Sequence, residues 1–233
     1  MDGLNKTSSP AYKCQYCEKE FRRESTLTAH SCENKRRYQQ QSEKGVLLGL
    51  QAYLRFYELT QGSAQFKSYD DFAASPYYGA FVKYGRYCVG VKCVNFLSFT
   101  EWLLKNNKKL DQWPRDALYQ EWLLVYAKKE AVQDALERSL LTMQEWADEN
   151  ASQFDHYFLY ANANKVCYHI STGRISPWVI YNSASGVAFL EQLNEEQIAM
   201  IIPWIDPDHW ARKFQDYLSD TEWIKTIMAD SNV

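Results

Sequence analysis

Four potential metal ligands near the N-terminus constrain the fold of this chain more than any other feature. Cys14 and Cys17 are separated by two residues, His30 follows after twelve more, and Cys32 comes after one more. This is the spacing of a tetrahedral Zn²⁺ site built on a hairpin and a helix. Because such a module is too short to fold on hydrophobic burial alone, the sequence predicts that metal binding stabilises it.

A small apolar core is interleaved with these ligands and completes the pattern of a recognised family. The segment Tyr12-x-Cys14-x2-Cys17-x3-Phe21-x5-Leu27-x2-His30 resembles the C2H2 zinc finger family position for position. The resemblance implies a ββα finger over residues 12–32 that holds one structural Zn²⁺ per chain.

The fourth ligand departs from that family. In C2H2 zinc fingers three to five residues separate the first histidine from the last ligand. Here Ser31 alone separates His30 from Cys32. Residues two apart in an unbroken helix point about 200° away from each other, so we expect the helix to unwind after His30. No other His or Cys lies closer than Cys88, which favours a Cys3His site. Two alternatives are a shell completed by water or a distant residue, and an unliganded cluster.

The resemblance also implies which finger residues face nucleic acid. Counting back from His30 places Arg23, Ser25 and Thr26 at base-facing positions, and an arginine there suits bidentate bonding to guanine. Further phosphate or base contacts are expected from Arg22, Lys35, Arg36 and Arg37. A single finger reads about three base pairs and binds weakly, with a Kd of roughly 10⁻⁴ to 10⁻⁶ M. The alternative is a finger that binds a partner protein.

Charge and composition describe an intracellular protein with an uneven charge distribution. Residues 1–45 carry nine Lys or Arg against six Asp or Glu, while the rest of the 233-residue chain is net acidic. No apolar run approaches the roughly 20 residues that a membrane crossing needs, and the N-terminus has no signal-peptide core. We therefore expect no membrane association and, for a phage-encoded protein, location in the host cytoplasm. Cys88, Cys93 and Cys167 have no disulfide-like spacing and are expected to be free thiols.

The predicted organisation is a disordered tail at 1–11, the finger at 12–32, a basic linker at 33–45 and an all-α domain at 46–233. The linker is either flexible or a solvated helical arm. The fold class is therefore mainly α. Leu47, Leu50, Leu54 and Tyr57 repeat at helical spacing up to Gly62, and a long helix follows Ala131 to near Asn150. Other predicted helix starts are Ser75-Pro76, the capping box Ser98 to Glu101, Pro114, Asn194 to Gln197, Asp206-Pro207 and Ser219 to Glu222.

One stretch permits two structures. Residues 166–181 have β-branched and aromatic residues on both sides of Thr172-Gly173, which suits a small β-hairpin. They equally suit a helix that ends at Gly173 and another that starts at Ser176-Pro177, and this second interpretation is favoured.

Two further surfaces are candidates for binding. Cations mixed with tyrosines form a possible second patch for single-stranded nucleic acid, although at helical spacing Tyr77, Phe81, Tyr84 and Cys88 also read as a core face. Its cations are Lys83, Arg86, Lys105, Lys108 and Lys109. Arg174 and Trp178 are a candidate partner surface, with a turn packed against the core as the alternative.

The sequence supports three functional hypotheses. The whole chain resembles zinc-finger proteins encoded by T4-like tailed bacteriophages, and that resemblance brings no activity with it. The first hypothesis is a nucleic-acid-binding accessory factor in phage DNA replication, recombination or transcription, with a replication or transcription protein as partner. The second is a protein-interaction adaptor. The third is a nuclease or deaminase that uses His169 or His209, but the chain has no phosphate-binding glycine loop and no nucleophile elbow.

Overall fold

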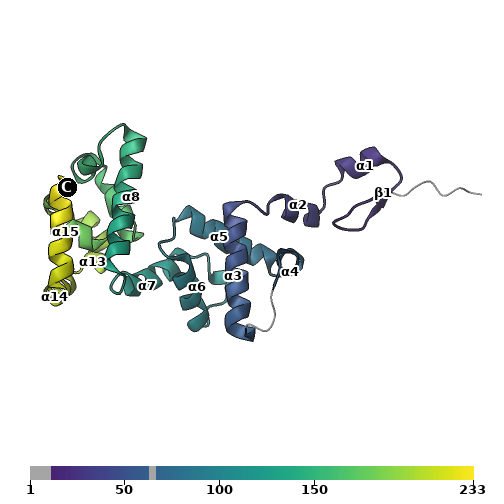
Figure 1. Cartoon of the computed structure of the whole chain (residues 1–233), viewed down its shortest axis with the longest axis horizontal. Helices are drawn as coiled ribbons and strands as arrows, with labels where there is room; N and C mark the ends of the chain where they lie inside the picture. The colour runs from purple at the N-terminus through teal and green to yellow at the C-terminus, as the bar shows by residue number, and fades with distance from the viewer. Residues whose placement is uncertain (1–11, 63–66) are drawn as a thin grey trace, which may run out of the picture. The chain divides into compact units, whose positions relative to one another are not determined.

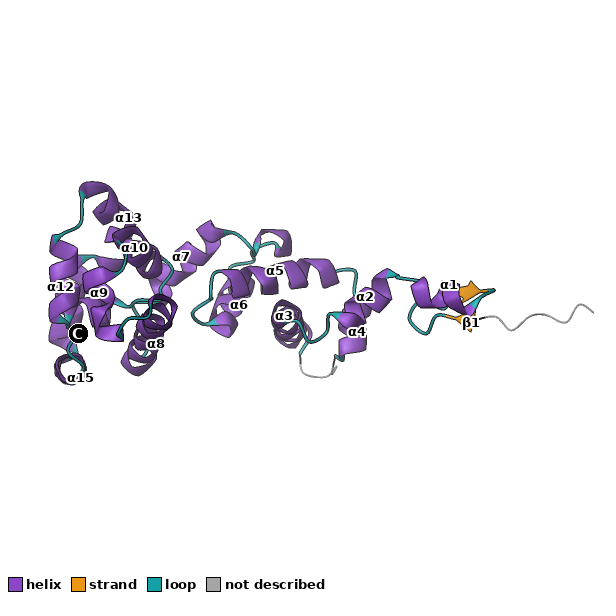
Figure 2. Ribbon diagram, turned by 90° about the horizontal axis from the view of Figure 1, so that it is seen from above, coloured by secondary structure: helices purple, strands orange, loops and turns teal. Residues whose placement is uncertain are grey.

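The computed structural model describes residues 12–62 and 67–233, and over these ranges the protein is mainly α-helical, as predicted (Figure 1). The two short strands lie at the N-terminal end of the described chain, and helices follow (Figure 2). The predicted disordered tail at 1–11 lies outside the described residues. The chain forms two compact units, of which the first contains residues up to Gly90 with Leu103–Trp113 and the second contains Val91–Trp102 with Pro114–Val233.

The first unit begins with the finger. Strands β1 (Tyr12–Lys13) and β2 (Glu20–Phe21) pair antiparallel, and Tyr12 lies opposite Phe21. Helix α1 (Glu24–Ala29) follows. Helix α2 (Glu33–Gln39) occupies most of the predicted linker. Of the two predicted forms of this linker, flexible or helical, the structure shows a helix over Glu33–Gln39.

A close crossing of α3 (Lys44–Gln61) and α5 (Tyr78–Gly90) forms the body of the first unit, with α4 (Tyr69–Ala74) beside both. Three glycines allow the approach: a Cβ on Gly85 would lie 2.1 Å from the carbonyl oxygen of Gly45 and 2.6 Å from the nitrogen of Gly49. Any larger residue at this crossing would force the two backbones apart.

The predicted end of α3 is confirmed, but two of the four apolar residues whose spacing predicted this helix are exposed. Gly62 follows the last helical residue with φ 76°. The face that packs on α5 carries Val46 and Tyr53 beside the glycines, whereas Leu47 is 45% exposed and Leu54 37% exposed. The helical repeat of large apolar residues does not identify the face that packs on α5, because the close crossing requires glycines there.

The second unit is built around α8 (Val132–Asn150), which confirms the predicted long helix. Its other elements include α7 (Asp116–Tyr126), η2 (Phe154–His156), α9 (Tyr157–Tyr160), α10 (Ala163–Ser171), α11 (Pro177–Tyr181), α12 (Ala184–Glu191), α13 (Glu195–Ile205), α14 (Pro207–Asp216) and α15 (Leu218–Asp230). Helix α6 (Phe96–Lys105) runs across the boundary between the units, and η1 (Leu110–Gln112) belongs to the first. No helix within the described ranges has the length and apolar character that a membrane span requires.

Several helix starts agree with the sequence. Asn194 caps α13 in a capping box with Gln197, and the Asp206 side chain caps α14. The favoured helix-turn-helix at 166–181 is confirmed, because α10 ends at Ser171 and the Ser176 side chain caps α11. The alternative hairpin at this place is therefore wrong.

Other predicted starts are wrong by a few residues. Helix α6 starts at Phe96, and the Asn95 side chain accepts from the Ser98 amide, so Ser98 is inside the helix. Helix α15 starts at Leu218, before the predicted cap at Ser219. Two of the predicted proline starts, Ser75-Pro76 and Pro114, are early, since α5 begins at Tyr78 and α7 at Asp116. Proline restricts the residue before it, so it marks the approach to a helix as well as its first turn.

Candidate metal centre

Cys14, Cys17, His30 and Cys32 converge in the finger, and their ligand atoms all lie within 4.8 Å of one another. Sγ of Cys17 is 3.3 Å from Nε2 of His30, so this imidazole nitrogen faces the sulfurs. Cys14 is buried and the other three are half-buried. The four residues form a cluster that could hold a metal ion.

The helix that carries the histidine ends where the ligand spacing requires. His30 is the residue after α1, and its backbone is extended, with φ −70° and ψ 123°. Cys32 is also extended, with φ −113° and ψ 164°. The predicted unwinding after His30 is confirmed, because extended backbone between the two ligands lets both side chains reach the same point.

Cys32 has a second structural role that the sequence did not reveal. It is the N-cap of α2, and its Sγ accepts a hydrogen bond from the Lys35 amide at 3.4 Å. An acceptor at this position satisfies a backbone donor that the helix itself leaves unpaired. The last residue of the cluster is therefore also the N-cap of the next helix, which joins the cluster directly to α2.

The pKa values of the two cysteines of the turn are shifted in opposite directions by hydrogen bonds and neighbouring thiols. A hydrogen bond from the Tyr16 amide is the largest cause of the lowered pKa of Cys14. The Lys19 amide acts the same way on Cys17, but desolvation and the neighbouring Cys32 and Cys14 outweigh it, so the pKa of Cys17 is raised. Without a cation, thiolates this close to one another repel, which is the condition that a bound metal ion relieves.

The turn that carries the first two cysteines is attached to α2. The Asn34 side chain donates to the Tyr16 carbonyl at 2.9 Å, and the Tyr16 and Tyr38 rings lie 5.3 Å apart. Tyr38 donates in turn to Asp70 of α4 at 2.7 Å. A chain of contacts therefore runs from the metal-binding turn through α2 to the body of the first unit.

The four predicted nucleic-acid residues in the finger itself are exposed. Arg22, Arg23, Ser25 and Thr26 lie at the start of α1 and in its first turn. Within the described ranges, Arg22 and Arg23 make no ion pair and no side-chain hydrogen bond. Both guanidinium groups are consequently available to an external anion.

The three predicted cations of α2 differ from one another. Lys35 donates to the His30 carbonyl at 3.1 Å, and Arg36 pairs with Glu33 on the surface. Arg37 donates to the Ala73 carbonyl at 2.6 Å and lies over the Tyr78 ring. Its side chain is 21% exposed. Arg37 therefore attaches α2 to the body of the unit and is poorly placed to contact phosphate.

Most of the rings in the predicted second patch are buried and cannot stack bases. Its cations Lys83, Arg86, Lys105 and Lys109 are exposed and Lys108 is half-buried. Phe81 and Tyr84 are at most 1% exposed, and Tyr84 packs edge-on against Trp113. Arg86 donates two hydrogen bonds of 2.7 Å to Glu43. Apart from Tyr77, which is exposed, the aromatic face belongs to the core, in agreement with the alternative interpretation.

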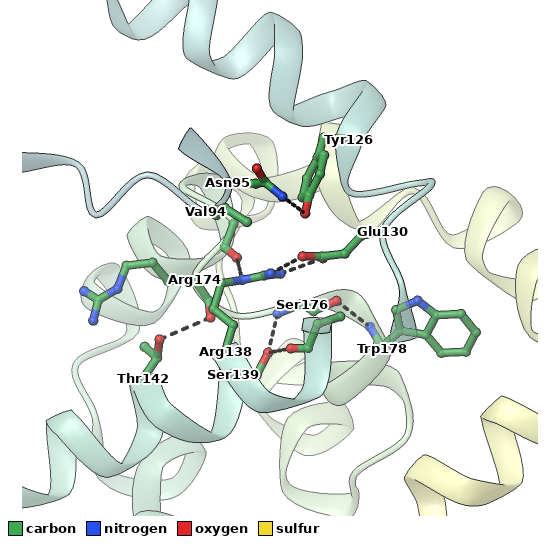
Figure 3. Close-up of polar contacts among 12 residues, drawn as sticks. Val94, Asn95, Tyr126, Glu130, Arg138, Ser139, Thr142, Arg174, Ser176 and Trp178 are labelled. Carbon is green, nitrogen blue, oxygen red and sulfur yellow. Dashed lines mark hydrogen bonds and ion pairs between the residues drawn. The ribbon is translucent and has the colours of Figure 1, made fainter. Parts of the chain in front are cut away.

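The predicted partner surface is also interior. Trp178 is completely buried. The turn before it is held by three side chains of α8: Arg138 donates to the Gly173 carbonyl at 2.6 Å, Thr142 donates to the Arg174 carbonyl, and Ser139 accepts from the Ser176 amide (Figure 3). The interpretation of this segment as a partner surface is therefore replaced by its alternative, a turn packed against the core.

A buried ion pair completes this cluster. Arg138 makes a bidentate pair with Glu130, whose side chain is only 1% exposed (Figure 3). Sequence reasoning missed both residues. The available signal was the placement of Arg138, Ser139 and Thr142 beside the apolar stripe of a long helix, where polar side chains need buried partners.

His169, one of the two histidines of the enzyme hypothesis, is already bonded at both ring nitrogens. Nδ1 is 2.7 Å from the Tyr157 hydroxyl, and Nε2 is 2.9 Å from the Arg174 guanidinium. Since arginine only donates, Nε2 accepts and Nδ1 carries the proton. Burial, with Arg174 nearby, lowers the pKa of His169 to about 3. This geometry holds Arg174 in place and leaves no ring nitrogen for a substrate.

Comparison with known proteins adds no relative: no family model matches the chain, and no curated protein or solved structure matches it significantly.

Proposed function

We propose that the Cys3His cluster binds Zn²⁺ and that the resulting finger binds nucleic acid. The observation that carries the proposal is the convergence of three sulfurs and one imidazole nitrogen within 4.8 Å. Zinc prefers this set of soft and borderline ligands in tetrahedral geometry, and four protein ligands make such a site structural. The ion would hold the hairpin and α1 together, because so small a module has little other core.

The free cations beside the cluster support the nucleic-acid part of the proposal. Arg22 and Arg23 are exposed and have no partner within the described ranges, unlike Arg37 and Arg86. Guanidinium groups at the entrance of a finger helix can bond phosphates or the major-groove edge of guanine. Ser25 and Thr26 extend the same exposed surface by one helical turn.

Affinity from one finger is expected to be low. A module that reads about three base pairs forms few phosphate contacts, so its binding is sensitive to salt. The rest of the chain would then supply a protein partner or further contacts. The resemblance to phage zinc-finger proteins extends the proposal to an accessory factor in phage DNA replication, recombination or transcription.

A salt titration of binding to duplex and single-stranded DNA tests the proposal. The Arg22→Ala/Arg23→Ala chain should bind less tightly, and its log Kd should depend less steeply on log salt, by about one for each phosphate that is no longer bound. The matched control is Arg115→Ala/Lys225→Ala, which removes the same charge from exposed positions elsewhere. Equal binding by the wild type and the finger variant rejects the finger as the contact and favours the adaptor hypothesis.

A further inference from the structure

A cavity in the second unit is lined by residues that sequence patterns did not single out. A cavity of about 470 Å³ opens between the segment that precedes α8 and the helices α14 and α15. We call it the basic aromatic cavity, and the residues that define it are Lys129, Glu130, Lys213, Tyr217, Asp220 and Trp223. Its volume is in the range of small-molecule pockets.

Two aromatic rings of the cavity face solvent. Tyr217 is 46% exposed and Trp223 is 43% exposed. All eight tryptophans lie in the described part of the chain, and Trp223 alone among them has a largely exposed side chain. Trp102 is half-buried, and the other six are buried in the core, as Trp178 and Trp210 are. An exposed indole in a cavity wall offers a flat apolar surface on which a planar ligand can stack.

The charge around these rings is mainly positive. Lys129 and Lys213 come from opposite walls, and neither forms an ion pair within the described ranges. The Lys213 ammonium lies 4.0 Å from the centre of the Tyr217 ring. Glu130 adds no free negative charge, because Arg138 pairs with its buried carboxylate. The cavity therefore presents two ammonium groups beside its rings.

The pKa of a nearby histidine reflects Lys213 and two cations next to the cavity lysines in the chain. Burial lowers the pKa of His209, and Lys128, Lys213 and Arg212 lower it further despite the opposite effect of Asp206. Lys128 precedes Lys129 in the chain, and Arg212 precedes Lys213. Both walls thus contribute to one region of positive potential, which attracts anions.

One carboxylate remains in the cavity. Asp220 forms no ion pair within the described ranges. A carboxylate can accept a hydrogen bond from the exocyclic amino group of a base, as it does from cytosine N4. An acidic peptide would satisfy the lysines, but it would meet Asp220 with like charge and would leave the rings without a stacking partner.

We propose that the basic aromatic cavity binds a nucleotide unit of single-stranded nucleic acid. The base stacks on Trp223, its amino group donates to Asp220, and its phosphate contacts Lys129 and Lys213. This combination of a ring platform with cations is how proteins hold single strands without strict sequence preference. The site is separate from the finger and goes beyond the function proposed above.

The test uses the full chain carrying Arg22→Ala/Arg23→Ala, so that the finger surface does not contribute. The probe is a short fluorescein-labelled oligodeoxycytidine, followed by anisotropy at low salt. Trp223→Ala and Lys129→Ala/Lys213→Ala should each weaken binding by about tenfold, and only the lysine variant should reduce the salt dependence. Trp223→Tyr, which keeps a ring, should bind more tightly than Trp223→Ala. Tyr160→Ala, which removes a ring that is 70% exposed elsewhere in this unit, should bind normally.

Competitors distinguish the source of the nucleotide and the class of ligand. Displacement by deoxycytidine monophosphate supports recognition of the nucleotide unit itself, and displacement by unlabelled strand alone supports a site that needs the connected strand. The proposal is overturned if Trp223→Ala binds as tightly as its parent, if Tyr160→Ala loses as much, or if polyglutamate displaces the probe equally well. Failure of the finger proposal has a different signature, namely unchanged duplex binding when Arg22 and Arg23 are replaced.

Discussion

The sulfur of Cys17 lies 3.3 Å from Nε2 of His30, across thirteen positions of sequence. This contact joins the hairpin turn to the end of α1, and Cys14 and Cys32 complete the group around it. Because Cys32 also caps α2, the proposed zinc ion would connect three elements: the hairpin, α1 and α2.

Replacing Cys32 with serine should weaken zinc retention. The hydroxyl is a poorer zinc ligand than a thiolate, although it can still accept a hydrogen bond at the N-cap. We therefore expect a chelator to remove zinc from Cys32→Ser at a chelator concentration at least about tenfold lower than the wild type requires. Ser31→Ala is the matched control, because it alters the exposed neighbour and no ligand. Unchanged retention in Cys32→Ser would mean that another group completes the shell.

Replacing Gly85 with alanine should destabilise the first unit. A Cβ there would lie 2.1 Å from the Gly45 carbonyl oxygen, so α3 and α5 would have to separate. Overpacking of this kind costs about 1–3 kcal/mol of unfolding free energy. Gly79→Ala in the same helix has nothing within 4 Å of the added carbon and should be neutral or stabilising by about 0.5–1 kcal/mol. Urea denaturation of both variants measures the difference, and equal stability would contradict the close crossing.

Much of this fold follows from local chemistry, and the exceptions have physical causes. The cap at Asn194 and the glycine after α3 act on neighbouring residues, so sequence alone located them. The buried face of α3 depends on Gly85, far along the chain, and no helical period reveals that contact. Trp178 illustrates the same limit, since a Ser-Pro-Trp turn looks exposed until the polar residues of α8 are known to bind it.

The finger was predicted more completely than the binding surfaces. Spacing and the angle between residues two apart in a helix located the end of α1 and brought Cys32 into the cluster. The role of Arg37 was not visible, because its partner carbonyl at Ala73 is distant in sequence. The sequence does not show which cationic side chains bind groups within the fold and which remain available to a ligand.

Removing Arg138 should destabilise the second unit strongly. Arg138→Met leaves the buried Glu130 carboxylate without its partner and the Gly173 carbonyl without its donor. Breaking one side of a buried ion pair costs about 3–5 kcal/mol. The double variant Arg138→Met/Glu130→Gln should recover part of that loss, because the charge is gone as well. Additive effects of the two single changes, measured by denaturation, would show that the residues are not coupled.

His169 should make the stability of the protein depend on pH. Its folded pKa of about 3 lies below the unfolded value near 6.5, so the unfolded state binds the proton first as the pH falls. Stability should therefore be constant above the unfolded pKa and decrease below it, by at most about 1.4 kcal/mol per pH unit for this residue. His169→Gln, which keeps an acceptor for Arg174, should show a shallower decrease. Parallel pH profiles for the two proteins would contradict a buried neutral histidine.

X-ray absorption at the zinc edge of the purified full chain decides whether the finger holds zinc through the Cys3His cluster. We expect one zinc per chain, bound by three sulfurs at about 2.3 Å and one nitrogen at about 2.0 Å. A site with two sulfurs, a shell completed by oxygen, or protein that contains no zinc would contradict this assignment.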